Sequence, residues 1–154
     1  MKIGIIQLTS SLEYKVNLEK IRHYLAQAKE QNVKAVFLPE CFYSLSDGTE
    51  VTPYIINGKD EHFCNISKLA TDFEMFILGG SATAYGAGEV KNRCYNFSPD
   101  GKDLGTYDKQ HLFSCDFVTS SGERKIINEG DLYKTGDESR IVQAGALKIG
   151  IGIC

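Results

Sequence analysis

Three residues carry side chains that together could perform covalent chemistry: Glu40, Lys109 and Cys154. A cysteine thiolate is a nucleophile, a carboxylate can move protons, and an ammonium group can stabilise developing negative charge. A thiol is mostly protonated at neutral pH, so a nearby base or cation is needed to supply the thiolate. The three residues are far apart in the sequence, and therefore only the fold can bring them together.

The residues before Cys154 predict a buried strand that presents this cysteine at its carboxyl end. Residues 146–154 form a β-branched apolar run in which Ile149, Ile151 and Ile153 share one face. The two intervening glycines leave the other face without side chains, as happens where another backbone or a ligand approaches closely. We therefore expect Cys154 to be the nucleophile if any residue here has that role.

Glu40 and Lys109 also follow predicted strands. Residues 35–38 are continuously apolar, which predicts a central parallel strand, and Pro39 ends it because proline cannot donate to a strand ladder. Glu40 is thus expected at the carboxyl end of that strand. Lys109 comes directly after a strand predicted to end at Tyr107.

The rest of the chain alternates predicted strands and amphipathic helices. Asn17 is the expected N-cap of the first helix, and Asn32 suits its exit. The region 114–136 is polar, contains glycine and lacks a period, so we expect a long loop of the kind that often serves a site. The remaining predicted elements are strands at 2–8 and 75–78, a first helix over 17–31, a second helix with Phe63, Ile66, Leu69 and Phe73 on one face, and two hairpins, 93–97 with 102–107 and 140–143 with 146–154.

This order of elements predicts an α/β fold with a mixed β-sheet that carries helices on one face, in a single domain over residues 1–154. Ligands of such sheets collect at the carboxyl ends of the strands, so Glu40, Lys109 and Cys154 are expected to converge there. Taken singly, each residue has a plainer interpretation. Glu40 would be an exposed loop acid, Lys109 a solvated cation beside Asp108, and Cys154 a buried thiol.

Composition narrows the classes of function. The chain has 154 residues, 42% hydrophobic and 24% charged, with a formal net charge of −3. Its acids and bases are interspersed, which argues against a nucleic-acid groove and favours a small molecule or another protein as partner. No window is long and apolar enough for a signal peptide or a membrane span, so we expect a cytoplasmic location. The five cysteines are odd in number and widely spaced, which favours reduced thiols over disulfides or a zinc site.

Three strings of the sequence resemble motifs of the nitrilase superfamily of carbon–nitrogen hydrolases. Residues 37–42 (FLPECF) are similar to its glutamate motif, residues 107–113 (YDKQHLF) to its lysine motif, and residues 150–154 (GIGIC) to the lead-in to its nucleophile. Their order and spacing agree as well. The region around Glu129 resembles the part that carries a second glutamate in many members.

The resemblance implies a fold and a reaction. The fold would be about half of the α-β-β-α sandwich of this superfamily, with the chain truncated on its C-terminal side. Cys154 would attack the carbonyl of a small amide, Glu40 would act as general base, Lys109 would stabilise the oxyanion, and Glu129 would position Lys109 or Glu40 or orient the substrate. Ammonia or an amine would leave, a thioester would be hydrolysed, and no metal or organic cofactor would be required.

Other interpretations remain open. His111 could be the base of a Cys–His pair, although its surroundings favour a packing role. The chain could be the glutaminase portion of an amidotransferase, or a non-catalytic remnant that binds a partner through an unfinished sheet. The lysine motif looks most like the omega-amidase branch, which implies a short dicarboxylic acid monoamide as substrate. We expect a homo-oligomer, because the final strand would otherwise expose apolar surface. We also expect little activity from the 154-residue chain alone.

Overall fold

A parallel sheet lies at the centre of the computed structural model, which describes all of residues 1–154. Its strands are β1 (Ile3–Ile5), β2 (Ala35–Phe37) and β4 (Phe76–Leu78), in the order β1-β2-β4. Both pairings are parallel. The apolar strand β2 is therefore central and parallel, as the sequence predicts.

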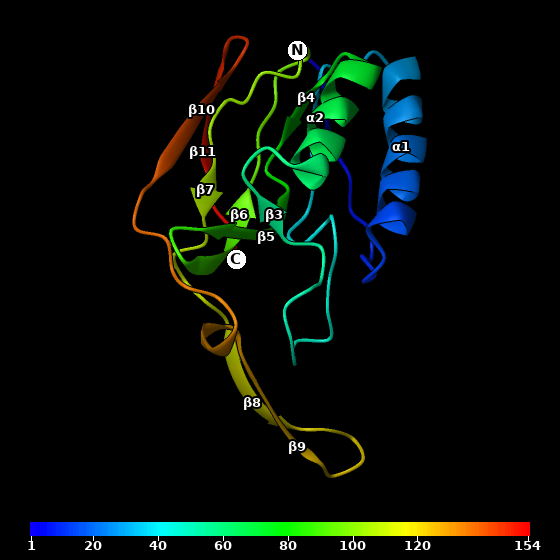
Figure 1. The fold of residues 1–154 in the computed structure, drawn as a ribbon. Helices are drawn as coiled ribbons and strands as arrows, with labels where there is room; N and C mark the ends of the chain where they lie inside the picture. Colours follow the sequence, from blue (N-terminus) through cyan, green and yellow to red (C-terminus); the bar gives the residue numbers. More distant parts are fainter.

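Two helices cover one face of this sheet: α1 (Tyr14–Glu30) and α2 (Glu61–Phe73). They lie side by side on the same side of the strands (Figure 1). Asp60 caps α2 by accepting a hydrogen bond from the backbone N–H of Phe63. The main core lies between helices and sheet; its fully buried members include Ile21, Leu25, Val36, Ile66 and Leu69.

A hairpin of β10 (Arg140–Ala144) and β11 (Leu147–Ile151) covers the opposite face of the sheet. Val142 and Ala144 pack there against Ala35 of β2 and Leu78 of β4. Because β2 and β4 are covered on both faces, they are apolar without alternation. The mixed α/β arrangement with helices on one face is confirmed.

A second sheet has the order β3-β5-β6-β7. Its strands are β3 (Ile56–Asn57), β5 (Ser81–Gly86), β6 (Glu89–Cys94) and β7 (Tyr107–Asp108). Strand β6 pairs antiparallel with both β5 and β7. A turn at residues 99–100 lies between β6 and β7, and an isolated bridge joins Phe97 to Asp103 across it.

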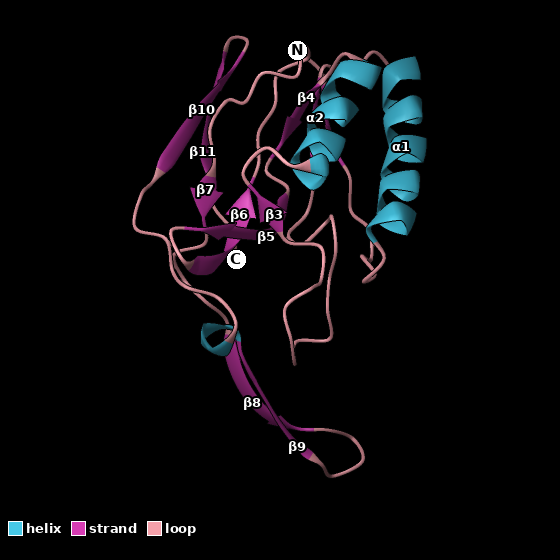
Figure 2. Ribbon diagram, in the orientation of Figure 1, coloured by secondary structure: helices cyan, strands magenta, loops and turns pink.

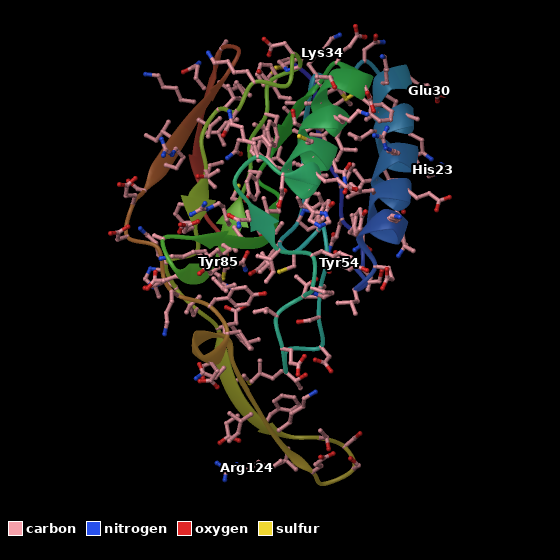
Figure 3. All side chains as sticks on the ribbon, viewed as in Figure 1. His23, Glu30, Lys34, Tyr54, Tyr85 and Arg124 are labelled. Carbon is pink, nitrogen blue, oxygen red and sulfur yellow. The ribbon has the colours of Figure 1, made fainter.

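The prediction that residues 114–136 form a loop is wrong. This segment contains a hairpin of β8 (Ser114–Val118) and β9 (Arg124–Asn128), followed by the 3-10 helix η1 (Glu129–Asp131). The hairpin projects from the body of the protein (Figure 2), and Arg124 lies far out along it (Figure 3). Most residues of both strands are exposed, so no buried face imposes the alternation by which a strand is recognised.

The predicted start of the first helix is also wrong. Helix α1 begins at Tyr14, and Asn17 is fully buried within it rather than capping it. The Asn17 side chain accepts from the backbone N–H of Ser11 and donates to the backbone carbonyls of Ser11 and Tyr43. A buried asparagine satisfied by neighbouring loops gives the same sequence signal as an N-cap. The exit is as expected, with Asn32 in the left-handed region at a φ of 57°.

The final strand is shorter and less buried than expected. Strand β11 ends at Ile151, and only one of its faces is covered, by the packing of Ile149 and Ile151. A Cβ added at Gly150 or Gly152 would have no neighbour within 4 Å, so the glycine face lies open. Neither helix of the chain has the length and apolar character that crossing a membrane requires.

Candidate active site

Glu40 lies in a tight turn that follows β2. The backbone of Pro39 accepts a hydrogen bond from Ser81, and the next residue, Cys41, adopts a left-handed φ of 49°. Gly80 makes the turn possible, because a Cβ there would come within 2.6 Å of Phe42 Cδ1. The end of β2 and the close approach of Gly80 thus fix the backbone position of Glu40, from which its side chain extends.

Lys109 continues the chain directly after β7. Its backbone N–H donates to the carbonyl of Asn92 on β6 at 2.9 Å, which extends the β6-β7 pairing by one residue. The neighbouring Asp108 forms a two-pronged ion pair with Arg93, at 2.6 and 2.8 Å. Asp108 is therefore not the partner of Lys109. The side chain of Lys109 is only 2% exposed, so its interpretation as a solvated surface cation is wrong.

The Lys109 ammonium joins two carboxylates. Its Nζ lies 2.8 Å from Oε1 of Glu40 and 2.8 Å from Oε2 of Glu129. The two carboxylate side chains keep 29% and 21% of their surface exposed. An ammonium group has three N–H donors, and two of them are engaged here. One donor is left for a further acceptor.

Glu129 reaches this cluster from the base of the β8-β9 hairpin. Its backbone N–H donates to the carbonyl of Phe113, and its Oε2 accepts from the backbone N–H of the same residue at 2.7 Å. This double link holds Glu129 beside the segment that follows Lys109. The 3-10 helix that follows the hairpin begins with Glu129, so the hairpin brings this residue to the cluster.

The two carboxylates control the charge of Lys109. Burial by itself would lower the pKa of this lysine, but the hydrogen bonds to Glu129 and Glu40 and their negative charges outweigh burial, and the pKa of Lys109 lies above its usual range. The lysine is accordingly a permanent cation across the neutral pH range. It can stabilise negative charge but cannot act as a base there.

Cys154 lies near the second sheet because the preceding residue is buried there. Ile153 is buried against Cys94 and Tyr107, the latter only two residues before Lys109. The chain end that carries Cys154 lies close to the strands of the second sheet (Figure 1). Its thiol is exposed, and no hydrogen bond or ion pair joins Cys154 to Glu40, Lys109 or Glu129. The structure thus joins three of the predicted residues and leaves the fourth unlinked.

Two other thiols are poorly suited to nucleophilic attack. Burial, reinforced by the negative charges of Glu40 and Glu129, raises the pKa of the Cys41 thiol to about 12. Burial also raises the pKa of Cys94 to about 12. Thiols with such pKa values are almost entirely protonated near neutral pH. None of the five cysteines is paired with another.

One polar contact of the cluster was not predicted from the sequence. Asn92 is 1% exposed, and its side-chain amide donates to Oε1 of Glu40 at 2.7 Å. Asn92 lies just before the strand predicted at 93–97, and in the structure it is inside β6 (Glu89–Cys94), where asparagine is uncommon. His111, the alternative base, is exposed and has no hydrogen-bond partner within the chain.

The apolar groove beside β1 and α1 lies away from these residues. Its lining includes Ile3, Ile5 and Tyr24, and none of Glu40, Lys109, Glu129 and Cys154. Ionisable groups with opposed charges at strand ends are a better guide to chemistry than groove size, so we place the candidate site at the charged cluster. No group of three or more His, Cys, Asp and Glu side chains is arranged to hold a metal ion.

The sequence is similar to those of known hydrolases over 99% of its length. The sequence is 30% identical over 155 residues to Omega-amidase NIT2 from Homo sapiens, covering 99% of this chain and 54% of that protein. It is 28% identical to Hydrolase C26A3.11 from Schizosaccharomyces pombe, covering 47% of that protein. The chain therefore spans about half the length of the curated relatives it matches.

The fold has close counterparts among solved structures. Nit3 from Saccharomyces cerevisiae, a member of branch 10 of the nitrilase superfamily, aligns with a TM-score of 0.77 and 26% identity, over 100% of this chain and 55% of that one. An amidase from Nesterenkonia sp. aligns with the same TM-score at 17% identity and the same coverage. The expected architecture, about half of the nitrilase fold, is confirmed. Residues 2–154 match the carbon-nitrogen hydrolase family throughout, and the chain belongs to that family.

Proposed function

We propose that this protein hydrolyses the carbon–nitrogen bond of a small amide through a cysteine thioester. The observation that carries the proposal is the placement of the Lys109 ammonium between the carboxylates of Glu40 and Glu129, with one N–H donor left over. A buried cation with a free donor is suited to an oxyanion, and an adjacent carboxylate is suited to proton transfer.

In the proposed reaction, Sγ of Cys154 attacks the amide carbonyl carbon while Glu40 takes the thiol proton. The carbonyl oxygen becomes an oxyanion, which Lys109 stabilises by about 3 kcal/mol. Glu40 then gives its proton to the departing nitrogen, the C–N bond breaks, and ammonia or an amine leaves a thioester on Cys154. Glu129 holds the Lys109 side chain in place.

The thioester is hydrolysed in a second half-reaction. Glu40, again a carboxylate, takes a proton from a water molecule as that water attacks the thioester carbon. The C–S bond breaks, Glu40 gives its proton to the departing sulfur of Cys154, and the carboxylic acid is released. Each proton taken by Glu40 is returned within the cycle, and none of the proposed steps involves a metal or organic cofactor.

The proposed substrate is the monoamide of a short dicarboxylic acid. This choice rests on the 30% identity to Omega-amidase NIT2 and on the lysine motif at residues 107–113. The likeness covers about half of that relative, so the proposal extends to the class of substrate and names no residue for the substrate's second carboxylate. Glutamine is the informative competitor, because preferential hydrolysis of glutamine would favour the glutaminase interpretation.

The test is ammonia release by the full product of the gene, with the 154-residue chain assayed beside it. The panel contains monoamides of four- and five-carbon dicarboxylic acids, glutamine, and an unsubstituted aliphatic amide. We expect hydrolysis of the monoamides, and loss of it in Cys154→Ala with no loss of folded protein. A full-length protein that folds but releases no ammonia from any member would contradict the proposal and favour an interaction module.

A further inference from the structure

We propose that Asn92 is a positioning residue that fixes one oxygen of Glu40 and thereby reserves the other for proton transfer. The inference rests on the proposed function of Glu40 as the general base. It starts from the carboxylate of Glu40, whose two oxygens have different surroundings. Oε1 accepts from Asn92 Nδ2 at 2.7 Å and from Lys109 Nζ at 2.8 Å, whereas Oε2 has no hydrogen-bond partner within the chain.

The orientation of the Asn92 amide is fixed by this contact. Nδ2 must face Glu40, because the opposite orientation would bring two oxygens to 2.7 Å of one another. The second hydrogen of Nδ2 lies toward the thiol of Cys41, at 3.9 Å between nitrogen and sulfur. Both donors of the Asn92 side chain therefore face the turn that carries Glu40.

This orientation leaves Oδ1 of Asn92 buried and without a hydrogen-bond partner, and it is the one buried side-chain polar atom of the chain in that condition. A buried acceptor without a partner calls for an explanation, and the orientation that the contact with Glu40 imposes on the amide supplies one. Asn96 provides the contrast on the same stretch of chain. It is equally buried, but it accepts from Gly79 and donates to Gly105, so its amide is satisfied at both ends.

Asn92 also links Glu40 to Lys109 through its backbone. Its carbonyl accepts from the backbone N–H of Lys109, while its side chain binds Glu40. One residue of β6 therefore sets the relative position of the base and the cation, which come from different segments of the chain. With Oε1 engaged by two donors, Oε2 is the oxygen available to take the proton of the nucleophile and of the attacking water.

A double-mutant cycle tests the link without requiring activity. The free energy of unfolding is measured by urea for wild type, Asn92→Ser, Glu40→Ala and the double variant, and Asn96→Ser replaces Asn92→Ser in a control cycle. We expect the effects of Asn92→Ser and Glu40→Ala to be non-additive, and those of Asn96→Ser and Glu40→Ala to be additive. Ser67→Ala, which removes a hydrogen bond from helix α2 to the carbonyl of Gly101, replaces Asn96→Ser if that variant does not fold.

Kinetics test the consequence for catalysis in the full gene product. Asn92→Ser and Asn92→Asp should each lower kcat at least about tenfold with little change in KM, since they displace the base rather than the substrate. Additive effects in the Asn92 cycle, or an unchanged kcat in both variants, would overturn the positioning role. A wild-type protein without any amide hydrolysis would overturn the proposed function instead, and the stability cycle would still decide whether Asn92 holds Glu40.

Discussion

The ammonium nitrogen of Lys109 lies 2.8 Å from Oε1 of Glu40, although 69 residues separate the two in the sequence. The contact joins the turn after β2 in the central sheet to the residue after β7 in the second sheet. It is therefore a property of how the two sheets pack, and its strength and chemistry can be tested by altering either side.

Removal of the Lys109 charge should destabilise the fold. Lys109→Met leaves the carboxylates of Glu40 and Glu129 near each other without the cation between them. Breaking a buried pair in this way costs about 3–5 kcal/mol, and we expect about 3 kcal/mol because both glutamates remain partly exposed to water. Urea unfolding at neutral pH measures the loss. A matched Lys68→Met on the outer part of α2 should change the free energy of unfolding by less than about 0.5 kcal/mol.

The same ion pairs predict how stability depends on alkaline pH. The pKa of Lys109 is raised in the folded state, so its ion pairs contribute fully below the unfolded-state pKa of about 10.4. Their contribution is lost as the pH rises through the higher pKa of the folded state. Wild type should therefore lose part of its advantage over Lys109→Met above about pH 10.4. A difference in unfolding free energy that stays constant from neutral pH to about pH 11 would contradict this account.

Gly80 should resist substitution because the Glu40 turn packs directly on it. A Cβ at Gly80 would lie 2.6 Å from Phe42 Cδ1 and 2.7 Å from Leu38 Cβ, so Gly80→Ala should cost about 1–3 kcal/mol. Gly150→Ala is the matched control, since a Cβ there has no neighbour within 4 Å. We expect the control to be neutral or slightly stabilising in urea unfolding. Equal destabilisation by the two substitutions would mean that the close approach at Gly80 is unimportant.

The cysteines should differ in their rates of alkylation. Cys154 and Cys64 are both exposed, whereas burial raises the pKa of Cys41 and Cys94 to about 12. Brief iodoacetamide treatment at neutral pH, followed by mass mapping, should label Cys154 several-fold faster than Cys64 if a base assists its thiol. Glu40→Gln should slow Cys154 and leave Cys64 unchanged. Equal labelling of the two exposed thiols would argue against Cys154 as an activated nucleophile.

The proposed base can be separated from the alternative at His111. In the full gene product, Glu40→Gln should reduce amide hydrolysis by at least about 100-fold, the usual contribution of a general base. His111→Gln should stay within about twofold of wild type, because this side chain is exposed and makes no hydrogen bond. Ammonia release measures both. A comparable loss in His111→Gln, with folding intact, would favour the Cys–His pair.

The sequence alone determined the local features of this protein. The apolar run at 35–38, the stripe at Phe63, Ile66 and Leu69, and the hairpin near Gly145 each depend on residues close in the chain, so periodicity and turn chemistry were sufficient to predict them. The three motif strings are likewise short and continuous, and they were sufficient to indicate the family. The resemblance also led to the prediction that Glu40, Lys109 and Cys154 act as base, oxyanion stabiliser and nucleophile, which the experiments above test.

Only the tertiary structure decided the surroundings of those side chains. The contact of Glu129 with Lys109, one of the alternatives left open by the sequence, the hydrogen bond from Asn92 to Glu40, and the burial of Asn17 all depend on segments distant in sequence, which local patterns do not describe. The hairpin at 114–128 was missed for a related reason: its strands are held by each other and not by burial, so they carry no alternating signature. Hydrophobic periodicity indicates which face of a single helix or strand is buried. The geometry of a polar cluster depends instead on how separate elements pack together.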